Sequence, residues 1–167
     1  MGNRSEAPST TPKGALGVKF FGSFDYQMDD RNRVPIPPVY RSEFESGGVV
    51  ATGTEPCVVL YTRDAFHEAA AAVEALPATD EGDAARRDFY GLAFPVQKDG
   101  QGRVLLVREL IDHASLRKEV KVVGVGRHME IWDRAAWDAG EQQRKATRKA
   151  ARNAAGRAAS APESTGA

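Results

Sequence analysis

The sequence has few of the residues that build disulfides, metal centres and membrane spans. Its 167 residues include one cysteine, Cys57, and three histidines, His67, His113 and His128, which share no ligand spacing. A single cysteine forms no disulfide within a chain, which is typical of a reducing cytosol, and Cys57 lies in an apolar run that predicts burial. No run approaches the roughly 20 apolar residues of a membrane span. We therefore expect a cytoplasmic protein with no metal and no membrane association.

An excess of charge of either sign is also absent. The chain has 23 basic and 23 acidic residues, a formal net charge of +0, whereas a protein that binds polyanions without selectivity is usually strongly basic. The balance hides a basic tail, rich in Ala, Arg and Lys, at 143–167. We expect this tail to be a frayed, solvated helix or disordered, and the alternative is a clamp on a nucleic-acid backbone.

Sequence motifs of enzymes are missing as well. There is no P-loop and no Gly-x-Ser-x-Gly nucleophile elbow, and the two glycines at 124–126 are more typical of a hairpin turn. Asp29 and Asp99 could be weighed as a catalytic pair, but each has an arginine four residues on, which lowers the pKa of the carboxyl and makes it a poor general acid. We expect no catalytic residue, no cofactor and no small-molecule substrate.

What the sequence does contain is an internal repeat. The stretch 29–37, Asp-Asp-Arg-Asn-Arg-Val-Pro-Ile-Pro, returns at 99–107 as Asp-Gly-Gln-Gly-Arg-Val-Leu-Leu-Val. At this spacing Phe24, Gln27, Asp29, Arg33 and Val34 correspond to Phe94, Gln97, Asp99, Arg103 and Val104. After one insertion the likeness continues, with 49–53 over 120–124, 59–61 over 130–132 and Phe66 over Trp137. Two copies of this length suggest a duplicated module whose halves pack as a pseudo-dimer.

Each copy of the motif predicts a strand, a tight turn and a second strand. Asp29 and Asp99 can bond the backbone two residues on, and Asn32 and Gly102 are residue types that enter positive φ at least cost. Apolar flanks then favour a β-hairpin. Each aspartate can pin the turn backbone or hold the arginine at the turn exit in a bidentate pair.

The arginines of these turns allow two interpretations. Arg31, Arg33 and Arg103 lie at or beside turns that can enter the DNA major groove, where arginine suits guanine O6 and N7. Alternatively, Arg33 and Arg103 form structural ion pairs with Asp29 and Asp99. The residues alone leave both interpretations open.

We divide the chain into four segments. These are a disordered arm at 1–15, a first module at 16–78, a second module at 79–142 and the tail. Within the modules, apolar periodicity predicts helices at 63–76 and 85–92, with a polar connection at 79–84. Strands are predicted at 119–124 and 128–132, and a helix from Arg134 onward with Trp137 on its apolar face.

The residues at 20–142 resemble the MraZ family, within the wider AbrB-like group of bacterial DNA-binding proteins. The resemblance is carried by both Asp-x-x-x-Arg motifs and by the Glu130-Ile131-Trp132 segment behind the second. It implies a β-rich α+β fold in which two tandem AbrB-like (SpoVT-AbrB) β-hairpin modules form a pseudo-two-fold barrel with short flanking helices.

The resemblance also implies a function. Members are nucleoid-associated regulators that bind double-stranded promoter DNA of their own division and cell-wall gene cluster as ring-shaped homo-oligomers. Arg33 and Arg103 would contact DNA with Arg31 assisting, Gln101 would read DNA in the less basic second turn, and the aspartates, Asn32 and Gly102 would orient the turns. Asn32 stands where the family commonly has glycine. Two alternatives remain open: a ring-forming scaffold whose Asp-Arg turns make subunit contacts, and a DNA-binding antitoxin, which normally has one copy of the module.

Overall fold

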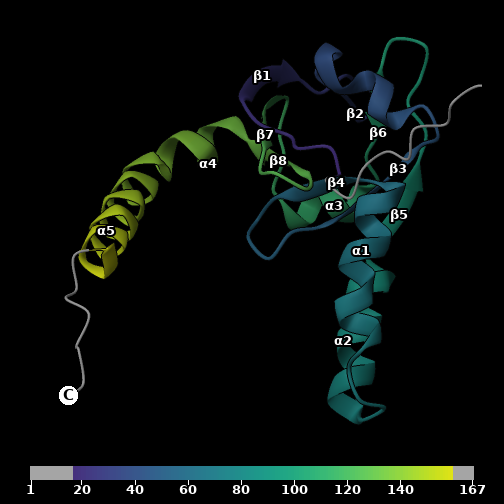
Figure 1. The fold of residues 1–167 in the computed structure, drawn as a ribbon. Helices are drawn as coiled ribbons and strands as arrows, with labels where there is room; N and C mark the ends of the chain where they lie inside the picture. The colour runs from purple at the N-terminus through teal and green to yellow at the C-terminus, as the bar shows by residue number, and fades with distance from the viewer. Residues whose placement is uncertain (1–16, 160–167) are drawn as a thin grey trace, which may run out of the picture.

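The computed structural model describes residues 17–159, in which one order of elements occurs twice (Figure 1). Each copy runs strand, strand, short helix, strand, strand, helix. The first copy comprises β1 (Ser23–Gln27), β2 (Arg33–Pro35), the 3₁₀ helix η1 (Pro38–Phe44), β3 (Gly48–Thr52), β4 (Val58–Thr62) and α1 (Arg63–Glu74). The second comprises β5 (Ala93–Val96), β6 (Arg103–Leu105), α3 (Arg108–His113), β7 (Glu119–Gly124), β8 (Met129–Asp133) and α4 (Arg134–Ala139). Helix α2 (Asp80–Gly91) joins the copies, and α5 (Glu141–Ala159) follows the second.

The strands form two antiparallel sheets that both combine the two copies. One is an open six-stranded sheet in the order β1-β7-β8-β4-β3-β5, and the other is the pair β2-β6. Because each sheet takes strands from both halves, the repeats interleave in one mixed α+β, β-rich body. Strand pairing within the described residues does not close this arrangement into the expected barrel.

The prediction that the two strands beside each Asp-x-x-x-Arg turn pair with each other as a β-hairpin is wrong. The strands that flank the first turn do not pair with each other: β1 pairs with β7, and β2 pairs with β6. Likewise β5 pairs with β3. The turns carry the chain from one sheet to the other, and prolines at 35 and 37 keep β2 short, since proline donates no ladder hydrogen bond.

The main core lies between the sheets and the short helices. Its centre is built from equivalent positions of the two copies: Val34 and Val104 are 0% and 1% exposed, and Ile36 and Leu106 are both 1% exposed. Burying each such side chain contributes about 1.5–3 kcal/mol. The two copies therefore depend on one another for stability.

Helices α1 and α2 form a hairpin that projects from the sheet body (Figure 1). Thr79, although it lacks a complete capping box, caps α2 by accepting from the Gly82 amide at 3.2 Å. The predicted polar connection at 79–84 is therefore largely the first turn of α2. Arg86 donates to the carbonyls of Leu76 and Pro77, and Phe66 stacks on Phe89 at 5.1 Å between ring centroids. These contacts hold the two helices together.

The C-terminal part of the described chain is helical. Asp133 caps α4, and Trp137 packs edge-on against Trp132 with 5.6 Å between ring centroids. The helix ends at Ala139, with Gly140 as its C-cap. Residues 143–159, expected to be a frayed helix or disordered, belong to the helix α5. The rest of the tail and the arm at 1–15 lie outside the described residues. Of the helices described in 17–159, none is both long and apolar enough to cross a membrane.

Candidate nucleic-acid interface

The first Asp-x-x-x-Arg turn is organised by the carboxylate of Asp29. Its Oδ1 accepts from the backbone amides of Arg31 and Arg33, both at 2.9 Å, and its Oδ2 accepts from Arg33 Nε at 2.8 Å. The Asn32 amide donates to the Asp29 carbonyl at 3.0 Å, and Asn32 has φ 60°. Asp29 thus bonds the backbone of its own turn, and Asn32 takes the positive φ within it.

The second turn repeats this geometry almost bond for bond. Asp99 Oδ1 accepts from the amides of Gln101 and Arg103 at 2.9 and 3.0 Å, and Oδ2 accepts from Arg103 Nε at 2.9 Å. Gly102, with φ 74°, closes the turn by donating to the Asp99 carbonyl at 3.0 Å. The sequence echo is therefore a structural echo.

Pairing of β2 with β6 places the two turns side by side. Val34 lies opposite Val104, and beyond the strands the Ile36 and Leu106 amides donate to the carbonyls of Gly102 and Asn32 at 2.8 and 2.9 Å. Each turn is consequently bonded to the chain that leaves the other turn, which relates the two by a pseudo-two-fold axis.

The aspartates and arginines cross-link the turns through ion pairs. Arg103 Nη1 lies 3.2 Å from Asp29 Oδ2, and Arg33 Nη1 lies 3.5 Å from Asp99 Oδ2. The two arginine side chains are 28% and 23% exposed. The ion-pair interpretation is thus present within one chain, across its two halves. These contacts use Nε and Nη1 of each guanidinium, and Nη2 takes no part in them.

The same hydrogen bonds hold the pKa values of both carboxyls below their ordinary range. For Asp29 the largest cause is the backbone hydrogen bond from Arg33, and for Asp99 it is the one from Arg103. Both groups are therefore ionised at neutral pH, and neither suits the role of general acid.

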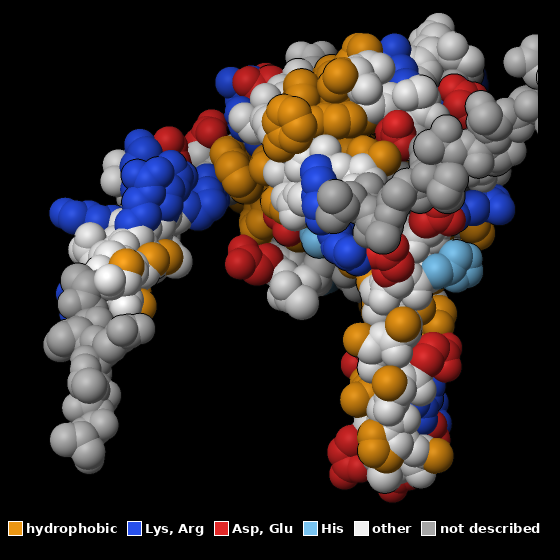
Figure 2. All heavy atoms as spheres, viewed as in Figure 1, with side chains coloured by type: hydrophobic (Ala, Val, Ile, Leu, Met, Phe, Trp, Pro, Cys, Tyr) orange, Lys and Arg blue, Asp and Glu red, His pale blue; other side chains and the backbone are white. Residues whose placement is uncertain are grey.

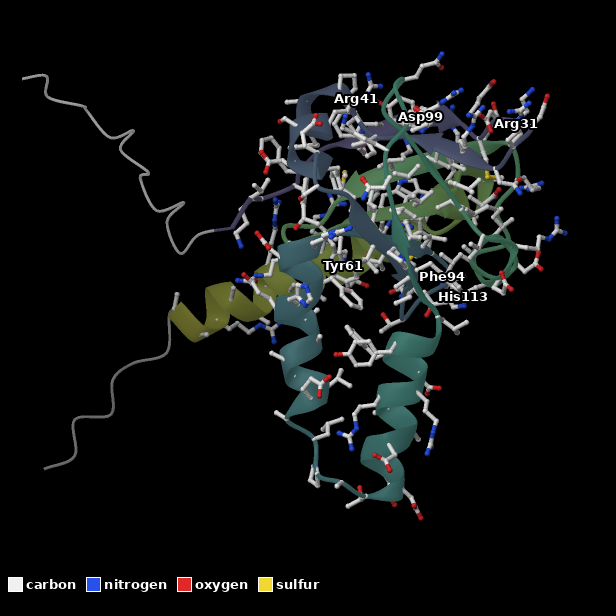
Figure 3. The ribbon with its side chains drawn as sticks, turned by 90° about the vertical axis from the view of Figure 1, so that its right-hand side faces the viewer. Arg31, Arg41, Tyr61, Phe94, Asp99 and His113 are labelled. Atoms are coloured by element: carbon white, nitrogen blue, oxygen red, sulfur yellow. The ribbon has the colours of Figure 1, made fainter. Side chains whose placement is uncertain are left out.

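Three longer side chains surround the cross-linked turns. Arg31 and Gln101 are exposed at the tips. Arg41 from η1 donates through Nε to the Ile36 carbonyl at 3.0 Å and covers Gly102, where an added Cβ would collide with its guanidinium. Figure 3 shows Arg41, Asp99 and Arg31 along one edge of the body, with Tyr61 and His113 away from it. This edge, made of the two turns and Arg41, is called the turn edge below.

Arg41 is the member of the turn edge that sequence reasoning did not assign to the site. Nothing in its local sequence pattern places it over the second turn. Its counterpart in the second copy, Ile111, is buried and carries no charge. A comparison of the two copies for unmatched arginines would have marked it.

A metal or reactive-cysteine site is not part of this arrangement. Within residues 17–159 no group of three or more His, Cys, Asp and Glu side chains could hold a metal ion. Cys57 is 1% exposed, as predicted, and burial raises the pKa of its thiol to about 12. The thiol is accordingly neutral and unreactive at neutral pH.

Comparison with known proteins agrees with the duplication. The family model for the MraZ protein, which carries an antitoxin-like description, matches twice, at residues 20–88 and 89–158. The transcriptional regulator MraZ of Dehalococcoides mccartyi is 35% identical over 130 residues, 77% of this chain and 89% of that protein. The transcriptional regulator MraZ of Thermomicrobium roseum is 38% identical over 121 residues, 72% of this chain and 85% of that protein. With one family match on each copy of the Asp-Arg turn, this chain belongs to the MraZ family.

Proposed function

We propose that this chain is a sequence-specific DNA-binding transcriptional regulator. The observation that carries the proposal is the turn edge, where two Asp-Arg turns with matching hydrogen bonds lie side by side, with arginines at and beside their tips. The names of the relatives, which are transcriptional regulators, support it. We further propose that it works in the cytoplasm, at the nucleoid, on the promoter of its own division and cell-wall gene cluster.

The turns would enter the major groove of double-stranded DNA. Arg31 and Gln101 stand at the exposed tips, where Arg suits guanine and Gln suits adenine edges. Arg33 and Arg103 stay bound to the aspartates and offer Nη2 to a phosphate or base. Fixing those arginines before DNA arrives lowers the entropy lost on binding. In this arrangement Asp29, Asp99, Asn32 and Gly102 orient the turns.

A homo-oligomeric ring would compensate for the weak attraction between one chain without net charge and DNA. A single chain with a net charge of +0 binds a polyanion weakly. In a ring the turn edges of several chains face one DNA, so weak contacts add up through effective concentration and read tandem short repeats. We expect a steep salt dependence, because each phosphate contact releases counterions.

The test is binding to a labelled fragment from upstream of the chain's own gene, compared with a scrambled fragment, across a salt series. Three variants are compared with the unaltered chain: Arg33→Ala/Arg103→Ala, Arg31→Ala/Gln101→Ala, and Lys19→Ala, an exposed control away from the turns. Light scattering reports the oligomer size of each.

The proposal predicts that the unaltered chain and the control prefer the native fragment. Both turn variants should lose this preference at unchanged oligomer size. If native and scrambled DNA bind alike, and Arg33→Ala/Arg103→Ala changes the oligomer size instead, the turns are architecture for a ring-forming scaffold and the DNA-reading assignment is wrong.

A further inference from the structure

Helix α5 has no packed face of its own. It has 19 residues, so it is about 28 Å long, and none of its residues is buried. Figure 1 shows it leaving the body beyond α4 and extending away from the sheet. Isolated helices are marginal in water, and most helix stability in proteins comes from tertiary packing. The helix is therefore suited to a surface outside its own chain.

The charge of α5 indicates which kind of surface the helix can bind. The helix carries six Lys and Arg residues and one Glu, a net charge of +5. Two cations are already engaged near its start: Arg144 stacks on Trp137, 3.6 Å from the ring centroid, and Lys145 pairs with Glu141 at 3.0 Å. Arg148, Lys149 and Arg152 continue the same face at helical spacing. A complementary partner must be acidic.

The α1–α2 hairpin has this property. Its residues 63–91 include seven acidic and three basic side chains, a net charge of −4. Asp80 and Glu81 are exposed at its tip, which is red in Figure 2, whereas the part of α5 nearest the body is blue. The outer face of α1 is small and apolar, with Ala71, Ala72 and Ala75 exposed, so a second helix can approach closely.

The two arms are placed to meet between copies and not within one. In Figure 1 they leave opposite ends of the body and project to the same side, far apart. A second copy set beside the first in the same orientation would bring its α1–α2 hairpin near α5 of its neighbour. Such a contact joins two different surfaces, and a repeated contact of this kind closes into a ring where the rotation allows.

We propose that α5 docks on the acidic α1–α2 hairpin of a neighbouring copy of this chain and is the contact that builds the homo-oligomer. The inference rests on the oligomer of the proposed function and names its interface. DNA is the other polyanion that could take α5. The second copy is favoured because Figure 3 shows the labelled Arg31 and Asp99 at the opposite end of the body from α5, and because it also gives the acidic hairpin a partner.

The experiment reverses each charged surface in the full chain and then mixes the products. One variant is Arg148→Glu/Lys149→Glu/Arg152→Glu, and the other is Asp80→Lys/Glu81→Lys/Asp88→Lys. Size is measured by light scattering without DNA, and each variant alone should fall from the assembly towards the single-chain mass of 18.0 kDa. Mixed together they should reassemble with alternating chains. The acidic α5 of one variant then meets the basic hairpin of the other, and the unaltered α5 meets the unaltered hairpin.

Controls separate this proposal from its rivals. The charge-matched variant Lys19→Glu/Arg108→Glu/Lys118→Glu, outside both arms, should keep the assembly. The inference is overturned if the α5 variant keeps its size, if mixing restores nothing, or if the unaltered chain is a single chain. An α5 variant of unchanged size that binds native and scrambled DNA equally less tightly assigns α5 to nucleic acid. If the unaltered chain forms the assembly but binds native and scrambled DNA alike, only the DNA-reading proposal is refuted, and the proposed interface stands.

Discussion

The two Asp-Arg turns share a backbone but differ at their outer surfaces. In both, one carboxylate holds two amides and one guanidinium at 2.8–3.0 Å. In the first turn Arg31 stands at the tip, and Asn32 faces an open groove that Ile111 also lines. In the second, Gln101 stands at the tip and Arg41 covers Gly102.

The comparison separates the residues that hold the two turns together from those that are exposed to a partner. The repeated residues Asp29, Arg33, Asp99 and Arg103 satisfy each other across the pseudo-two-fold axis, so their first role is to fix two turns at a set distance. The tip residues Arg31 and Gln101 differ between the copies and are exposed, so a partner can distinguish one turn from the other. A duplicated chain can change these positions in one copy without disturbing the other.

The positive-φ position gives the largest effect. Gly102→Val places a β-branched residue at φ 74° and under Arg41, and we expect a loss of about 3 kcal/mol in unfolding free energy, the upper end for such strain. Denaturant unfolding measures it. Gly100→Ala is the matched control, because nothing lies within 4 Å of its added Cβ. Asn32→Gly should leave the unfolding free energy almost unchanged, because glycine also adopts positive φ. A loss similar to that of Gly102→Val would show that the two turns differ in backbone as well as in side chains.

The helix caps of the two copies give the next effect. Asp133 accepts from the Ala136 amide and from Arg117, whereas its counterpart Thr62 accepts from the Ala65 amide alone. Asp133→Ala should therefore cost about 2 kcal/mol and Thr62→Ala about 1 kcal/mol. Thermal and denaturant unfolding test the order, and equal losses would mean that Arg117 adds nothing to the cap.

The sequence predicted the local features of these turns. Asp at the first position, and Asn or Gly before the arginine, led to the positive φ that the structure has at Asn32 and Gly102. The strand at 119–124 has the predicted bounds. These features depend on neighbours in the chain, so residue type and spacing determine them.

The sequence did not predict the long-range partners. Whether β1 pairs with β2 or β7 depends on which surface the rest of the chain buries, and an apolar strand fits either. The ion pair of Arg103 with Asp29 follows only once β2 and β6 are paired, so it was out of reach of local patterns. The family match extends to 158, past the expected limit at 142. The expected limit fell short because an alanine-rich basic helix has the composition of a solvated tail. The module boundaries at 78 and 142 stay predictions.

Acid should weaken the two turns equally. Their hydrogen bonds lower the pKa values of Asp29 and Asp99 in the folded chain, so both carboxylates stabilise the fold at neutral pH. This contribution is lost as the pH falls below the ordinary value of about 4 and through the lowered folded pKa. Asp29→Asn and Asp99→Asn should each flatten the decline of melting temperature between neutral and acidic pH to the same extent. Unequal slopes would show that the cross-linked network favours one carboxylate.

The smallest change is an exchange of the two tips. Arg31 and Gln101 are exposed, so replacing either alters stability by no more than about 0.5 kcal/mol. Under the proposed function, Arg31→Gln should lower the salt slope of DNA binding by about 1 for each engaged turn, and Gln101→Arg should raise it by about 1. The variant with both changes has the original charge but carries it on the other turn. If it keeps the salt slope and loses the preference for the native fragment, the two turns read different bases. If it keeps both, the turns are equivalent and their outer surfaces carry no sequence information.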